Sequence, residues 1–125
     1  MEKFSLKDDI FKYAKETFNS EPEYLWANDP DSAVLRHIDN NKWYAIIMNI
    51  AKSKLGSSSN EKIDILDVKC DPMLIGSLLH NDGYFPAYHM NKQNWITITL
   101  DGSVPKEEIF NFMHLSFELT KKKRR

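Results

Sequence analysis

Apolar residues recur at two different spacings along the chain, and these spacings predict a mixture of helices and strands. Helical spacing appears first, at Leu6, Ile10, Phe11, Ala14 and Phe18. Ser5 is placed to cap this helix. Pro22 ends it, because the residue before a proline avoids helical geometry.

Strand-like segments follow this first helix. The expected strands are 23–26, 33–38, 42–50 and 62–69. The second and third form a hairpin around Asp39-Asn40-Asn41, since these residues tolerate left-handed turn geometry. The glycine- and serine-containing segment 54–61 is typical of a loop.

Two further helices and one more strand complete the pattern. Asp71-Pro72 places a hydrogen-bond acceptor at a helix cap and a proline at the first helical position, and Gly83 is a terminator. Residues 95–100 alternate as a half-buried strand, and a last helix runs from Pro105 to Leu119. The order α-β-β-β-β-α-β-α predicts an α+β domain: a mostly antiparallel sheet of about five strands, helices packed on it, and one open face.

The composition is that of one globular domain, which we place at residues 1–120 with a basic tail at 121–125. No apolar run reaches the roughly 20 residues that span a bilayer, and the amino terminus lacks a secretory pattern. A single cysteine, Cys70, excludes an internal disulfide and has no second thiol for a zinc site. We therefore expect a cytoplasmic protein with no membrane contact, no metal and no cofactor.

The net charge of −1 hides an asymmetry between the tail and the body. Five of the 17 basic residues form the tail Lys121–Arg125, and the body without it carries 12 basic and 18 acidic residues, a charge of −6. An acidic body disfavours strong non-specific binding to nucleic acid, although it is compatible with a local basic patch.

The most informative stretch is Pro86-Ala87-Tyr88-His89-Met90-Asn91-Lys92-Gln93-Asn94-Trp95, which precedes the last expected strand. It combines two aromatic rings, an imidazole, amides, an ammonium and a thioether. A core does not need this mixture, because each buried polar group requires a partner. A binding site for a flat, anionic or polar ligand does use such groups.

Four more candidates lie near the ends of expected strands, namely Arg36, Lys42, Trp43 and Lys69. We expect them to converge with the 86–95 run at one edge of the sheet. Structural roles remain open for several candidates: Trp43 and Trp95 as packing residues, and His89 as the partner of a backbone carbonyl. Lys69 and Lys92 favour function, because lysine rarely faces a core without a partner.

Catalytic patterns are missing from the sequence. It contains no nucleophile elbow, no glycine-rich phosphate loop and no His-Glu-x-x-His motif. Asp64 and Asp67 share a strand at odd spacing, so their side chains point to opposite faces and form no dyad. We expect no catalytic residues and a protein that is not an enzyme.

Three segments, Asn41–Ala45, Leu66–Pro72 and Pro86–Lys92, together with Ser116–Thr120, closely resemble the MmcQ/YjbR family of small bacterial proteins. The chain departs from the family pattern at Gln93-Asn94, where a histidine often precedes the tryptophan, and at Phe117, where tyrosine is common. The resemblance implies a frataxin-like or secretion-chaperone-like α+β fold and a double-wing DNA-binding protein. Carried over position by position, it implies contacts by Arg36, Lys42, Trp43, Lys69, Tyr88, His89, Asn91, Lys92 and Trp95.

Three ligand classes follow from these residues. DNA is the leading expectation, with lysines and Arg36 on phosphates and Tyr88, His89 and Asn91 on bases or sugars, so that binding is modest and salt-sensitive. The alternative is a chaperone-like adaptor, monomeric or dimeric, that binds a protein partner through an aromatic- and Met-rich surface. A small-molecule pocket formed by His89 and Lys69 is the third.

Overall fold

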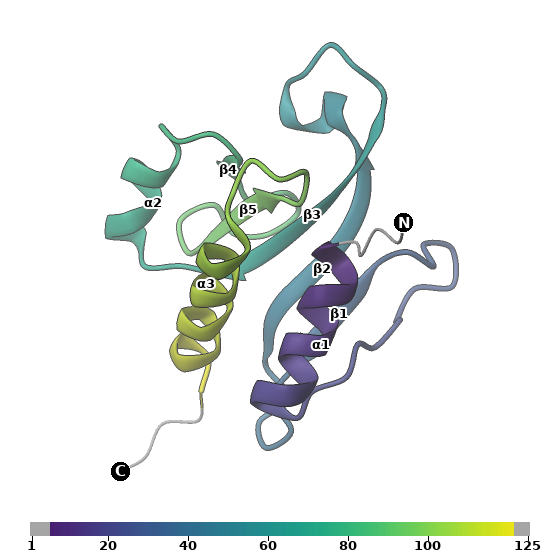
Figure 1. Ribbon diagram of the computed structural model, residues 1–125, viewed down its shortest axis with the longest axis vertical. Coiled ribbons are helices and arrows are strands. Elements are labelled where there is room, and N and C mark those ends of the chain that lie inside the picture. The colour runs from purple at the N-terminus through teal and green to yellow at the C-terminus, as the bar shows by residue number, and fades with distance from the viewer. Residues whose placement is uncertain (1–5, 122–125) are drawn as a thin grey trace.

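The computed structural model describes residues 6–121, and its elements form one antiparallel sheet with helices packed against it (Figure 1). In chain order they are α1 (Leu6–Phe18), β1 (Ala33–Arg36), β2 (Trp43–Ala51), the 3₁₀ turn η1 (Lys52–Leu55), β3 (Lys62–Lys69), α2 (Pro72–Leu78), β4 (Tyr84–Pro86), β5 (Trp95–Thr99) and α3 (Lys106–Leu119). The strands lie in the order β1-β2-β3-β5-β4. The predicted α+β class is confirmed. Ser5, expected to cap α1, and tail residues 122–125 lie outside the described part of the chain.

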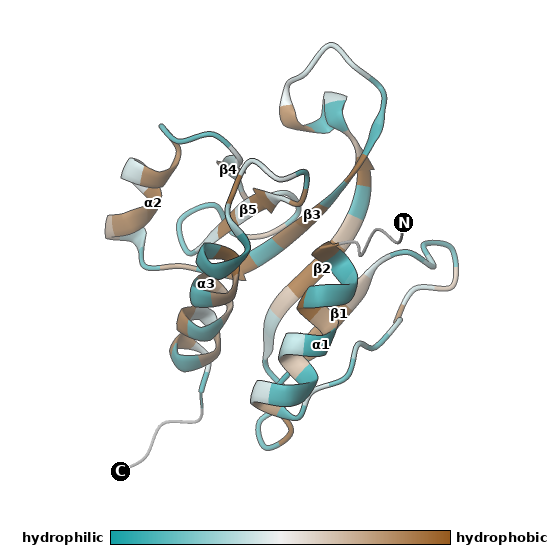
Figure 2. Ribbon diagram, viewed as in Figure 1, coloured by the Kyte–Doolittle hydropathy of each residue, from teal (hydrophilic) through white to brown (hydrophobic). Residues whose placement is uncertain are grey.

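One face of the sheet is covered by α1 and α3, which lie side by side in front of the strands (Figure 1). Their inward side chains, such as Ile10 and Met113, are buried against Leu66 and Val68 of β3. The solvent side of α1 is hydrophilic, whereas the strands behind it are hydrophobic (Figure 2). This amphipathic division is what places both helices on the same face.

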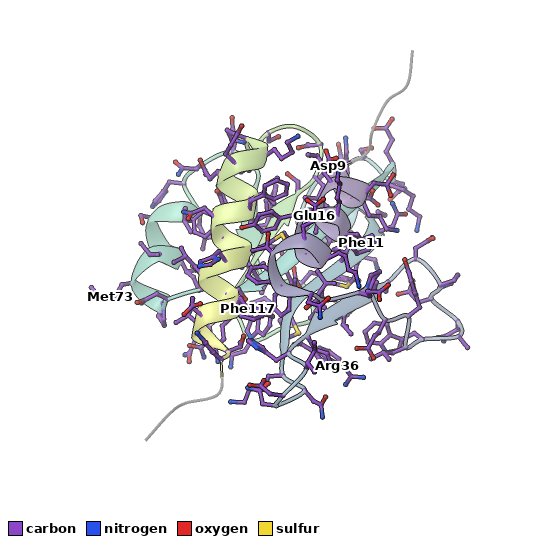
Figure 3. All side chains as sticks on the ribbon, turned by 60° about the horizontal axis from the view of Figure 1, so that its bottom comes forward. Asp9, Phe11, Glu16, Arg36, Met73 and Phe117 are labelled. Atoms are coloured by element: carbon purple, nitrogen blue, oxygen red, sulfur yellow. The ribbon has the colours of Figure 1, made fainter. Side chains whose placement is uncertain are left out.

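Stacked aromatic rings join the two long helices. Tyr13 of α1 stacks on Phe110 of α3 with ring centroids 4.2 Å apart, and Phe18 stacks on Phe117 at the same distance. Phe117 points from α3 toward α1 (Figure 3), and it also stacks on the buried ring of His37. Phe117 therefore acts as a packing residue.

The opposite face of the sheet has no helix on it within residues 6–121, as predicted. Its apolar residues include Ile46 and Met48 of β2 and Ile63 and Ile65 of β3. Side chains from loops and strand ends cover them instead, namely Trp26, Trp43, Leu55, Tyr88 and Met90. We call this surface the open face.

Three details of the secondary structure differ from the sequence prediction. The segment 23–26 forms a single bridge, between Glu23 and Val34, rather than a strand. The fifth strand of the sheet is β4, whose three residues are too short for a periodic signal. Helix α2 ends at Leu78, before Gly83, and Gly83 instead turns the chain into β4 with a φ of 88°.

The Ser116 side chain hydrogen-bonds α3 to the sheet, and replacing this residue should lower the stability of the protein. Its hydroxyl donates to the Tyr44 carbonyl at 2.6 Å and accepts from the Lys69 N–H at 2.8 Å. Ser116→Ala leaves both backbone groups without this partner, so we expect a loss of about 2 kcal/mol in the free energy of unfolding, measured in urea. Ser77→Ala, which removes an exposed hydroxyl from α2, is the control, and an equal effect of the two changes would contradict the assignment.

Candidate functional site

A half-open pocket lies on the open face, and two candidate residues, Trp43 and His89, line it. Its volume is about 430 Å³, and we call it the open-face pocket. It is lined by Trp26, Asn28, Asp29, Ser32, Trp43, Ile46, Met48, His89 and Met90. These residues come from the loop before β1, from β2 and from the 86–95 run. Three segments distant in sequence therefore build one site.

Two tryptophan rings form a corner in this pocket. The rings of Trp26 and Trp43 lie 5.9 Å apart between centroids and are nearly perpendicular, at 84°. An irregularity in the β1–β2 pairing, between Leu35 and Arg36, places Trp43 opposite Arg36. Trp43 packs against the apolar cluster of the open face, whereas the following residue, Tyr44, is buried on the helix side.

The 86–95 run is a tightly bonded turn that lies over β5. The Asn91 side chain accepts from the Gln93 N–H at 2.8 Å, and the Asn91 carbonyl accepts from the Trp95 N–H at 2.9 Å. His89 has a left-handed φ of 63° and is exposed, and its ring lies 3.9 Å from that of Tyr88. Asn91 thus shapes the turn, while His89 reaches the pocket.

Beneath this run lies a carboxyl group that the sequence did not single out as a site. Asp67 of β3 is fully buried, and the Thr97 hydroxyl donates to its Oδ1 at 2.5 Å. The same Thr97 oxygen accepts from the Tyr88 N–H at 2.9 Å. The other oxygen, Oδ2, has no hydrogen-bond partner among the described residues. Burial raises the Asp67 pKa to about 7, although Thr97 and Lys92 act to lower it.

Arg36 is held by an acid from the neighbouring loop. Its Nε and Nη2 donate to the two carboxylate oxygens of Glu23, at 2.8 and 2.5 Å. The hydrogen bond from Arg36 also lowers the pKa of the Glu23 carboxyl. A bidentate pair of this kind satisfies the guanidinium locally, so Arg36 is not free for a phosphate.

The candidates were expected at one edge of the sheet, and the structure instead places part of the set at neighbouring strand ends across several strands. Arg36 pairs with Trp43 across β1 and β2, and Lys69 pairs with Trp95 across β3 and β5. Lys42 and Lys92 are exposed in turns, and Trp95 is largely buried in the open-face cluster. Tyr88, His89 and Lys92 line a second hollow of about 380 Å³ beside Leu55. Arg36, Lys42 and Lys69 line neither of these two hollows.

Several pocket residues are not identified by the sequence pattern. That pattern places Trp26 in a strand and Met48 in a hairpin, without a role in a site. Trp26 could have been noticed because it follows Tyr24 and Leu25. Together they make three consecutive large apolar residues before a turn-rich segment.

Asp67 could have been identified from the alternation of side chains along β3, because it lies on the same face of the strand as Ile63 and Ile65. The opposite placement of Asp64 and Asp67 is confirmed, since Asp64 pairs with Asn49 on the helix side. A carboxyl group on the apolar face of a strand is therefore visible in the sequence, although its depth of burial is not.

The described chain has neither a membrane-spanning helix nor a metal-binding cluster. No helix in residues 6–121 combines the length and apolar composition that a membrane crossing needs. Across the same residues, no group of three or more His, Cys, Asp and Glu side chains is arranged to hold a metal ion.

Comparisons with known proteins identify close relatives. The family model described as YjbR matches residues 15–119. The uncharacterized protein YyaQ of Bacillus subtilis is 44% identical over 115 residues, which cover 92% of this chain and 98% of YyaQ. A crystal structure of a Pseudomonas syringae protein is 41% identical, with a TM-score of 0.89 over 92% of this chain and 98% of that one. The Deinococcus radiodurans protein DR2400, a domain of the type DUF419, is 26% identical, with a TM-score of 0.72 over 95% of this chain and 80% of its own.

Proposed function

We propose that this chain, which belongs to the YjbR family, is a non-enzymatic binding domain that holds a segment of a protein partner in the open-face pocket. The observation that carries the proposal is the lining of the pocket. Five of its nine residues are two tryptophans, two methionines and one isoleucine, the other four are Asn28, Asp29, Ser32 and His89, and none is lysine or arginine. Aromatic and methionine side chains are enriched at protein interfaces and adapt to varied apolar partners.

The size and surroundings of the pocket suit a peptide segment. A volume of about 430 Å³ lies within the usual range for ligand pockets and accommodates one or two side chains. Tyr24 and Leu25, which directly precede Trp26, are 55% and 44% exposed. Large apolar side chains exposed beside a pocket extend the surface on which a partner packs.

DNA is the second candidate, and three lysines without ion pairs in the described chain, two of them exposed, favour it. Lys42, Lys69 and Lys92 form no ion pair with the described residues, and such free cations bind phosphates. The Arg36–Glu23 pair and the acidic body weigh against it. DNA binding by this chain would depend on a few lysines and would fall steeply with salt.

Selection from a random peptide library separates the two candidates. We expect peptides that bind the wild-type protein and lose about tenfold or more in affinity with Trp43→Ala, because a buried tryptophan dominates an interface. Met90→Ala tests the same pocket if Trp43→Ala unfolds the protein, and Ile38→Ala, an exposed apolar residue at the β1–β2 turn, is the control.

The same preparations are titrated with labelled duplex DNA at two salt concentrations. If no pocket-dependent peptide is selected, the protein-partner proposal is wrong. If, in that case, DNA binds at low salt and Lys69→Ala or Lys92→Ala weakens the binding, then DNA rather than a protein segment is the ligand.

A further inference from the structure

We propose further that the open-face pocket receives an arginine side chain of the partner, with the guanidinium against a free indole face beside the Trp26–Trp43 contact and Asp29 as its counter-charge. This inference rests on the proposed function, because it names the side chain by which the partner segment is recognised. Three features of the pocket support it: the two tryptophan rings, Asp29 and the absence of lysine and arginine from the lining.

The tryptophan corner is suited to a cation. The rings of Trp26 and Trp43 meet edge to face, at 84° and with centroids 5.9 Å apart, so the angle beside this contact is bordered by the surfaces of both rings. The face of an indole carries a negative quadrupole, and it attracts ammonium and guanidinium groups more strongly than other aromatic rings do. Perpendicular rings allow a cation to contact one ring face while its apolar stem packs on the other ring.

Asp29 supplies the charge. Asp29 is one of the residues that line the pocket, and the Ser32 hydroxyl donates to its Oδ2 at 2.6 Å. Among residues 6–121, no donor bonds its Oδ1, so that oxygen can accept from a ligand. A positioned carboxylate beside aromatic faces adds a charge-assisted hydrogen bond to the attraction of the rings.

Neither lysine nor arginine from residues 6–121 lines this pocket. Arg36, beside Trp43 in the sheet, is already bound to Glu23. The Arg36–Glu23 pair therefore leaves Asp29 without a partner of opposite charge in this part of the chain. The excess of acidic residues in the body also favours a cationic partner.

Arginine fits these groups better than lysine does. Its planar guanidinium stacks on an indole and hydrogen-bonds a carboxylate at the same time, whereas an ammonium is compact and strongly hydrated. Ile46 and Met48 in the pocket lining offer apolar surface to the methylene stem of the side chain.

Two peptides that differ only in charge test the inference. The probes are acetyl-Leu-Arg-Leu-amide and the same peptide with citrulline, which keeps the shape of arginine but is neutral. Titration is followed by the indole N–H resonances of the protein, with the buried Trp95 as an internal reference. We expect saturable shifts at Trp26 and Trp43 with the arginine peptide and about tenfold weaker binding of the citrulline peptide.

Variants of Asp29 and Asp31 test which carboxylate provides the negative charge that binds the arginine peptide. Asp29→Asn keeps an acceptor for the Ser32 hydroxyl and should weaken the arginine peptide about fivefold or more while leaving the citrulline peptide unchanged. Asp31→Asn removes the same charge from the same loop outside the pocket lining, and it should have little effect. Methylguanidinium chloride, the free cation, should bind more weakly than the arginine peptide.

Several outcomes would overturn the inference. Equal binding of the two peptides at Trp43 would leave a peptide-binding pocket without a preference for arginine, so the protein-partner proposal would survive alone. An absence of saturable shifts with the arginine peptide would also overturn it. Methylguanidinium binding as tight as that of the arginine peptide would assign the pocket to a small organic cation instead.

Discussion

Replacing Asp67 by asparagine is expected to stabilise the protein at pH 8 by about 2–4 kcal/mol. At this pH the buried carboxyl group is ionised in the wild-type protein, and the substitution removes the cost of burying that charge. The pKa of this carboxyl is raised from 3.8 to about 7, chiefly by burial. A difference of about three pH units corresponds to roughly 4 kcal/mol at 1.36 kcal/mol per unit, which is the upper limit of the gain.

The direction of the pH dependence follows from proton binding. Between about pH 4 and pH 7 the folded protein holds the Asp67 proton, whereas the unfolded chain has released it. The free energy of unfolding contributed by this group therefore falls as pH rises through this window, and it stays low above pH 7. Asp67→Asn should flatten this slope and change stability little near pH 4.

Urea unfolding from pH 4 to pH 8 measures this effect. Asp64→Asn is the matched control: it removes an acid from the same strand on the opposite face, where Asn49 still finds an acceptor. That variant should retain the wild-type slope. A wild-type slope that persists in Asp67→Asn would show that Asp67 does not titrate in this range.

Replacing Gly83 by alanine is expected to destabilise the protein by about 3–4 kcal/mol, the second large effect. Gly83 has a φ of 88°, and an added Cβ would lie 2.5 Å from Val104 Cγ2 and 3.0 Å from Ser103 Cβ. Left-handed geometry costs an alanine about 1–2 kcal/mol, and overpacking of a buried site adds about 1–3 kcal/mol. Val104 is buried, so it has little room to move.

Gly102→Ala separates the steric clash from the backbone strain. Gly102 has a similar φ of 95°, but an added Cβ there would meet no atom within 4 Å. We expect a loss of about 1–2 kcal/mol at this position, measured by urea unfolding. Equal losses in the two variants would mean that Val104 moves away without cost.

Structural features that depend on a few neighbouring residues in the sequence were predicted correctly. The Asp71 side chain caps α2 by accepting from the Met73 N–H at 2.9 Å, and Asn41 in the β1–β2 turn has the expected positive φ, of 62°. Both features depend on backbone chemistry within a few residues. Strand β4 was not predicted, because it exists only through pairing with β5.

The candidate site was predicted in part. The 86–95 run is unusual in the sequence, and His89 and Met90 from it line the open-face pocket. Its Asn91, proposed for base contacts, makes the hydrogen bonds that shape the turn. Arg36 looks like a free cation in the sequence, but its partner Glu23 lies 13 residues away and meets it only through the Glu23–Val34 bridge.

The α+β class, the β1–β2 hairpin, the start of α2 and the family resemblance can be predicted from the amino-acid order, because periodicity, caps and short motifs act over a few residues. Which side chains are available to a ligand depends on the folded chain. It paired Arg36 with Glu23, buried Asp67 under the 86–95 run, and brought Trp26 against Trp43 beside Asp29. Charge, pKa and access depend on neighbours in space, and the chain order does not specify those neighbours.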